Sequence, residues 1–105
     1  MSAETLLTAA HRLNRFFRID MKRGGLVVDE TLAALETLEA QIRTAQAGGE
    51  HDAGLLQAAV ITARDLRLDT SEHGGMVAIR TEIAFDTLDK AIRAVGGRKA
   101  ETADA

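Results

Sequence analysis

Four glycine pairs divide this proline-free chain of 105 residues into four segments of similar length. Glycine reaches the left-handed conformation that ends a helix, and a chain without proline lets helices run uninterrupted between such stops. The spacing predicts helices near residues 3–22, 27–47, 53–70 and 76–95, with N-caps at Ser2, Asp29 and Asp52. Residues 98–105 have no apolar pattern and are expected to form a flexible C-terminal tail. The glycine pairs are Gly24-Gly25, Gly48-Gly49, Gly74-Gly75 and Gly96-Gly97.

Apolar residues recur three and four positions apart in these segments, which is the period of one face of a helix. The second segment has Leu35, Leu38 and Ile42 in this register, and the fourth repeats the pattern from Phe85 to Ile92. Short connections make consecutive helices antiparallel neighbours. We therefore predict an all-α four-helix bundle made of two helical hairpins. The hairpins span residues 3–47 and 53–95, within a single domain over residues 1–97.

The two hairpins resemble each other in sequence. Residues 6–20 match residues 55–69 at 7 of 15 positions, and residues 24–43 match residues 74–93 at 9 of 20. We infer an internal duplication in which two related hairpins pack face to face about a pseudo-twofold axis, because neither hairpin can bury its apolar seam alone. The alternative is that similar amphipathic hairpins use similar residues. The sequence does not indicate whether the two hairpin loops lie at the same end of the bundle.

Metal-binding patterns are missing from the chain. It has no cysteine, which excludes thiolate sites. None of His11, His51 and His73 follows a glutamate by three positions, as a di-iron bundle would require. A calcium loop that starts at Asp20 would have Thr31, and not glutamate, at its twelfth position. We therefore expect no metal site and no cofactor.

Signatures of catalysis and of membrane insertion are missing as well. The two serines, Ser2 and Ser71, fall where helix caps or loops are expected, and no nucleophile or phosphate-binding motif is present. The hydrophobic fraction of 46% and the charged fraction of 28% are typical of a globular chain. No secretion signal is visible, and no apolar run approaches the roughly 20 residues that span a bilayer. We expect a cytoplasmic protein without catalytic residues.

The second hairpin is more apolar than the first. It has two isoleucines at the positions where the first hairpin has Asp29 and Ala33. These side chains lie partly outside the helix seam, so they either complete an asymmetric core or form a second apolar face that binds a protein. A homodimer is the expected use of a free face. The candidate protein-interface residues are Ile61, Leu68, Ile79 and Ile83.

The first helix carries an excess of positive charge. Residues 1–25 have five basic and two acidic side chains, a net charge of +3, whereas residues 26–52 have six acidic and one basic, a net charge of −5. The two helices are expected to neutralise each other, for example through Arg18 and Glu30. The alternative is a face for anions or nucleic acid. The candidate residues for this face are His11, Arg15, Arg18 and Lys22.

Three polar residues at the end of the first helix recur at the end of the third. They are consistent either with stabilisation of a helix C-terminus or with two equivalent anion-binding clusters. The two sets are Arg15, Arg18 and Asp20, and Arg64, Arg67 and Asp69.

These observations favour a protein that works by binding and not by catalysis. We expect a small adaptor or regulatory protein that acts through protein–protein binding, with another protein or a second copy of itself as partner. The alternatives are a nucleic-acid modulator that uses the basic first helix, and an accessory subunit of an enzyme. We expect no membrane partner.

Overall fold

Four helices account for most of the residues that the structure, a computed structural model, describes. It describes residues 5–49 and 51–104, with side chains as far as residue 96. Over these residues the fold is all-α and compact, without a strand, which confirms the predicted all-α class with four helices. In chain order the helices are α1 (Leu6–Lys22), α2 (Asp29–Gln46), α3 (Ala53–Glu72) and α4 (Ile79–Asp104).

Side-chain oxygens cap the N-termini of α1 and α3. Thr5 precedes α1, and its hydroxyl accepts a hydrogen bond from the N–H of Thr8 at 3.1 Å. In return, the Thr8 hydroxyl accepts the N–H of Thr5 at 3.0 Å, so two otherwise unpaired donors are satisfied. Asp52 accepts the N–H of Leu55 at 2.9 Å, which confirms its predicted role as a cap. The predicted cap at Ser2 lies outside the described residues.

Two helix ends differ from the sequence prediction. α2 begins at Asp29 itself, with Val28 as N-cap, so the prediction of Asp29 as a cap is wrong. α4 runs through Gly96-Gly97 to Asp104, past the expected end at residue 95. The physical reason is that glycine weakens a helix but does not break it. The flexible tail expected at residues 98–105 stays a prediction, because their side chains lie outside the described part of the chain.

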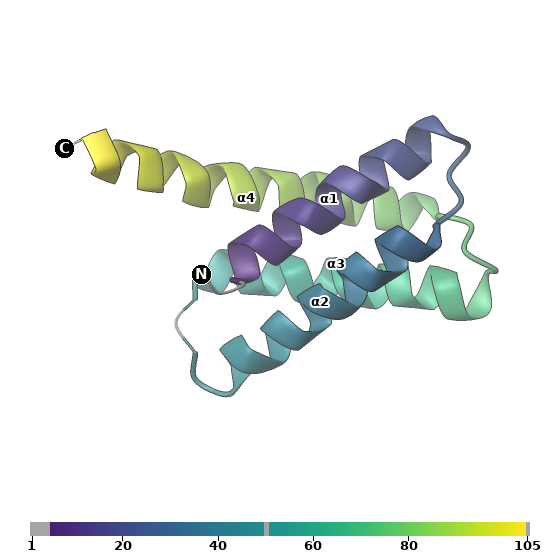
Figure 1. The fold of residues 1–105 in the computed structure, drawn as a ribbon, viewed down its shortest axis with the longest axis horizontal. Helices are drawn as coiled ribbons and strands as arrows, with labels where there is room; N and C mark the ends of the chain where they lie inside the picture. The colour runs from purple at the N-terminus through teal and green to yellow at the C-terminus, as the bar shows by residue number, and fades with distance from the viewer. Residues whose placement is uncertain (1–4, 50, 105) are drawn as a thin grey trace.

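Both helices of each hairpin contact the other hairpin. α1 contacts α2 and α4, α3 contacts the same two helices, and α1 also touches α3 across the centre. Figure 1 shows the α1–α2 loop and the α3–α4 loop side by side at one end, while α4 extends beyond the other helices at the opposite end. The structure thus places both hairpin loops at the same end, which the sequence left open.

Two backbone hydrogen bonds join the hairpin loops. Together they form an isolated antiparallel bridge centred on Leu26 and Met76. Each loop supplies one donor and one acceptor, so the bridge sets the register of one loop against the other. The bonds run from the Val27 N–H to the Gly75 carbonyl at 3.0 Å and from the Val77 N–H to the Gly25 carbonyl at 3.2 Å.

The apolar core follows the seams that the sequence predicts. At its centre the rings of Phe17 (α1) and Phe85 (α4) stack with centroids 3.7 Å apart and planes inclined by 5°. Because these helices belong to different hairpins, the two hairpins share one core. The predicted seam residues Leu35, Leu38, Ile42, Phe85, Leu88 and Ile92 are all buried.

Two loop glycines have backbone conformations that other residues avoid. The φ angle is +82° at Gly25 and +89° at Gly75. The N–H of each glycine donates to the carbonyl of an aspartate in the preceding helix, at 2.9 Å in both cases, and closes that helix end. A Cβ at Gly75 would also lie 3.3 Å from Cδ1 of Leu26, across the bridge.

Replacing Gly75 with alanine is therefore expected to lower the free energy of unfolding by about 1–2 kcal/mol. Urea denaturation followed by circular dichroism measures this, since the chain has no tryptophan or tyrosine to report by fluorescence. Gly96→Ala is the matched control, because Gly96 is helical and a Cβ there meets no atom within 4 Å. It should leave stability unchanged or raise it by about 0.5–1 kcal/mol. Equal losses in both variants would contradict the argument.

Candidate functional site

Each of the two predicted polar clusters contains a buried aspartate, Asp20 in the first hairpin and Asp69 in the second. Asp20 lies in the last turn of α1, and its Oδ2 accepts the Thr31 hydroxyl at 2.6 Å and the Val28 N–H at 3.4 Å. Val28 is the N-cap of α2, so the carboxylate of one helix takes over the capping of the next. A carboxylate engaged in this way is not available to an outside ligand.

Asp69 makes the corresponding contacts in the second hairpin. Its Oδ2 accepts the Thr81 hydroxyl at 2.6 Å and the Ala78 N–H at 3.0 Å. Its Oδ1 also accepts Nη2 of Arg80 at 3.3 Å, and Nε of Arg80 pairs with Asp65 at 3.4 Å. Asp69 is fully buried and every one of these contacts lies within its own hairpin.

One arginine of each cluster, Arg18 or Arg67, pairs with an acid of the opposite hairpin. Arg18 (α1) donates to Asp86 (α4) at 3.1 Å, and its guanidinium lies 5.6 Å from the centroid of the Phe17 ring. The predicted pairing of Arg18 with Glu30 is therefore wrong. The reason is that Arg18 lies on the side of α1 that contacts α4, and charge balance along the sequence does not reveal this.

Arg67 (α3) makes the equivalent connection to α2. Its guanidinium binds both carboxylate oxygens of Glu39, a geometry that suits the planar fork of arginine. This hydrogen-bonded contact with Glu39 raises the pKa of Arg67 above its ordinary value, against the opposing effect of burial. Both arginines therefore serve the packing of one hairpin on the other.

The predicted basic face of α1 is thereby divided. Arg18 is paired, Lys22 is exposed in the last turn, and only His11 and Arg15 line a common groove. Neither of these two makes a hydrogen bond or ion pair with another described residue. Of the predicted face, His11 and Arg15 are thus the two residues that one ligand in this groove could contact together.

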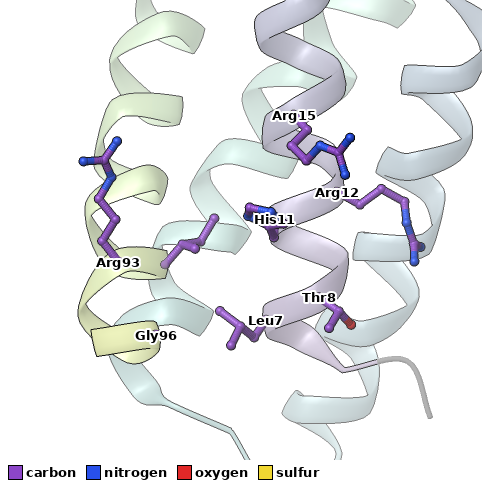
Figure 2. Close-up of a pocket in the computed structure, with 8 residues that line it drawn as sticks. Leu7, Thr8, His11, Arg12, Arg15, Arg93 and Gly96 are labelled. Atoms are coloured by element: carbon purple, nitrogen blue, oxygen red, sulfur yellow. The ribbon is translucent and has the colours of Figure 1, made fainter. Parts of the chain in front are cut away.

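The groove containing His11 and Arg15 lies between α1 and α4 and has a volume of about 660 Å³. Figure 2 shows Leu7 and His11 directed from α1 toward α4, whereas Arg12 and the guanidinium of Arg15 extend toward the other side of α1. Sequence reasoning missed the contribution of α4. The spacing of residues along α1 does not reveal which helix of the other hairpin packs beside it, because tertiary packing decides this. The lining residues are Leu7, Thr8, His11, Arg12, Arg15, Ile92, Arg93 and Gly96.

The predicted apolar face lies on the second hairpin, and all four of its residues are exposed. We call Ile61, Leu68, Ile79 and Ile83 the hairpin-two face. The exposed fractions are 75% for Ile79 and 61% for Ile83, and lower for Ile61 and Leu68. Ile61 and Ile83 line one shallow groove of about 160 Å³ between α3 and α4. Sequence reasoning missed Leu26, Val28 and Met76, which are also exposed at the neighbouring loop end.

Several other site types find no support in the described part of the chain. No three side chains among histidine, cysteine, aspartate and glutamate are grouped to hold a metal ion there. Within residues 5–49 and 51–96, no buried side-chain polar atom lacks a hydrogen-bond partner. None of the helices, over their described residues, is long and apolar enough to cross a membrane.

No protein-family model, curated protein or solved structure matches this chain. The candidate binding surfaces of the chain are the hairpin-two face and the α1–α4 groove.

Proposed function

We propose that this protein is a small, non-catalytic adaptor or regulatory protein of the cytoplasm that binds another protein through the hairpin-two face. A second copy of the chain is the expected partner. The observation that carries the proposal is the exposure of Ile79 and Ile83, at 75% and 61% of their surface. Large apolar side chains grouped on a surface favour a partner, because covering them removes apolar area from water.

A comparison of the two hairpins supports this role. At an offset of 50 residues, Ile79 and Ile83 correspond to Asp29 and Ala33 of the first hairpin. A helix thus forms in the first hairpin with a polar and a small residue at these positions. Ile79 and Ile83 are exposed and outside the buried seam, which favours binding as their role.

We further propose that the hairpins arose by internal duplication and are related by a pseudo-twofold axis. Matched contacts support this proposal in addition to the sequence identities. The hydroxyls of Thr31 and Thr81 each donate at 2.6 Å to an aspartate in the last turn of the preceding helix. The two bonds of the loop bridge are reciprocal, as a twofold relation requires.

The two alternative functions have less structural support than protein binding. A nucleic-acid modulator needs several cations placed to follow a phosphate backbone, and of the predicted face Arg18 is already paired with Asp86. An accessory role in an enzyme has no particular side chain to support it. We therefore retain protein binding as the proposed function.

The double variant Ile79→Asp plus Ile83→Ala tests the proposal, because it introduces the residues that the first hairpin carries at these positions. We expect the wild type to elute at twice the 11.2 kDa chain mass in size-exclusion chromatography with light scattering, and the variant at the chain mass. Its free energy of unfolding should stay within about 0.5 kcal/mol of the wild type, since both side chains are exposed.

Ile19→Asp is the control, because Ile19 is an exposed isoleucine on α1, outside the hairpin-two face. It should leave the mass of the wild-type complex unchanged. A wild type that stays monomeric at all concentrations would refute self-association. A double variant that unfolds would show that these residues complete the core and do not form an interface.

A further inference from the structure

We infer that the α1–α4 groove binds a single-chain amphipathic carboxylate, such as a fatty acid of medium length. The alkyl chain would lie along the apolar floor and the carboxylate would meet His11 and Arg15. This inference goes beyond the proposed function and does not rest on it, because the groove and the hairpin-two face share no residue.

The size and lining of the groove fit a small ligand. Its volume of about 660 Å³ lies within the roughly 300–1,000 Å³ that is typical of small-molecule sites. Leu7 and Ile92 supply apolar surface from the two facing helices. Gly96 leaves its end of the groove open, because a Cβ there would meet no atom within 4 Å.

Charge and apolar surface are separated along the groove. Leu7, His11 and Arg15 follow one another along α1 at four-residue spacing, and all three line the groove. From Leu7 to Arg15 the helix rises by about 12 Å, at 1.5 Å per residue, which is the reach of a medium-length alkyl chain. The apolar end is therefore at Leu7 and the cationic end at Arg15.

The α4 side of the groove follows the same order. Asn14, next to Arg15, donates to Asp89 of α4 at 3.2 Å, which places Asp89 at the cationic end. Because α4 runs antiparallel to α1 (Figure 1), later residues of α4 lie toward the apolar end, and Figure 2 shows Gly96 at the level of Leu7. A ligand with an anionic head and an apolar tail is complementary to the groove, because its head would lie at the cationic end and its tail at the apolar end.

The charges at the cationic end favour an anion. None of the lining residues is acidic. Asp89, the nearby carboxylate, is already engaged by Asn14 and by Nε of Arg93 at 2.9 Å. His11 and Arg15 have no partner among the described residues, so a ligand carboxylate would form charge-assisted hydrogen bonds without displacing an existing one.

A second groove on the other side of the molecule provides a comparison. It lies between α2 and α3, has a volume of about 300 Å³, and has Val60 at the position that corresponds to His11. Arg64 corresponds to Arg15, but Glu39 also lines this groove and binds Arg67. It is smaller and already contains a carboxylate, so we expect it not to bind the ligand.

Isothermal titration calorimetry with sodium dodecanoate, below its critical micelle concentration, tests the inference. We expect saturable binding of one molecule per chain. Arg15→Glu should weaken the affinity at least tenfold, because it replaces the cation that faces the carboxylate. Arg64→Glu, the matched control in the smaller groove, should change it less than twofold. Acetate, which has the head group alone, should show no binding.

Gly96→Leu tests the apolar end. A Cβ at this position meets no atom within 4 Å, and the leucine side chain beyond it is expected to fill the groove and abolish dodecanoate binding. Circular dichroism verifies that each variant remains folded. Amide chemical-shift changes on addition of dodecanoate should map to residues 7–15 and 92–96, and the double variant Ile79→Asp plus Ile83→Ala should bind dodecanoate normally.

Four results would overturn the inference. These are the absence of saturable dodecanoate binding, equal losses in Arg15→Glu and Arg64→Glu, shift changes confined to the hairpin-two face, and full binding by Gly96→Leu. A gel shift of RNA or DNA that Arg15→Glu abolishes, without dodecanoate binding, would assign the groove to nucleic acid instead. Sedimentation with anionic phospholipid vesicles, without dodecanoate binding, would assign it to a lipid surface.

Discussion

Replacing Phe85 with alanine is expected to lower the free energy of unfolding by about 3–5 kcal/mol. Phe85 is fully buried, and its ring stacks on Phe17 with a centroid separation of 3.7 Å. The loss has two sources, which are the apolar transfer energy of the ring and the cavity left between α1 and α4. Urea denaturation followed by circular dichroism measures the change.

Phe85→Leu is the matched control for this prediction. Leucine is the residue that the first hairpin has at the corresponding position, Leu35, and the substitution retains most of the volume. It should cost less than about 1.5 kcal/mol. A double-mutant cycle with Phe17→Leu should give a coupling energy of about 0.5–1.5 kcal/mol for the stacked pair. A loss below about 1 kcal/mol for Phe85→Ala would contradict the central place of this contact.

Replacing Asp69 with alanine is expected to lower the free energy of unfolding by about 3 kcal/mol. The buried carboxylate accepts hydrogen bonds from the Thr81 hydroxyl, the Ala78 N–H and the Arg80 guanidinium. Alanine leaves the buried Thr81 hydroxyl and the part-buried Ala78 N–H without their acceptor, and it removes the cap from the start of α4. Denaturation by urea, monitored by circular dichroism, is again the measurement.

The equivalent change in the first hairpin provides the comparison. Asp20 accepts the Thr31 hydroxyl at 2.6 Å, but its contact with the Val28 N–H is longer, at 3.4 Å, and its carboxylate makes no hydrogen bond with an arginine of the described residues. Asp20→Ala should therefore cost less than Asp69→Ala, by about 1 kcal/mol. Asp69→Asn, which retains one acceptor oxygen, should fall between the wild type and Asp69→Ala. The reverse order for the two alanine variants would show that the arginine contact adds nothing.

The sequence predicted the helices better than it predicted their ends. Periodic apolar residues identify a helix because they repeat over several turns, and all six seam residues named in α2 and α4 are buried. The predicted end of α4, at residue 95, was wrong because the Gly96-Gly97 pair weakens the helix without ending it. The predicted N-cap of α2, Asp29, was wrong because the actual N-cap is Val28, whose N–H donates to Asp20 of another helix.

The candidate surfaces were predicted to different extents. The exposed isoleucines could be found by comparing the hairpins position by position, since the difference lies in the residues themselves. The α1–α4 groove could not be found in that way. His11 and Arg15 were recognised as basic residues on one face of α1, but Ile92, Arg93 and Gly96 complete the groove from a helix about eighty residues later in the chain.

Local information in the sequence thus determined four helices, their buried faces and the residues that differ between the hairpins, because these depend on spacing and side-chain type. Only the tertiary structure decided that both loops meet at one end through the Leu26–Met76 bridge, and that Arg18 pairs with Asp86 and not with Glu30. The physical reason is that an amphipathic helix specifies which face it buries but not which partner covers that face. The choice depends on interactions among all four helices at once.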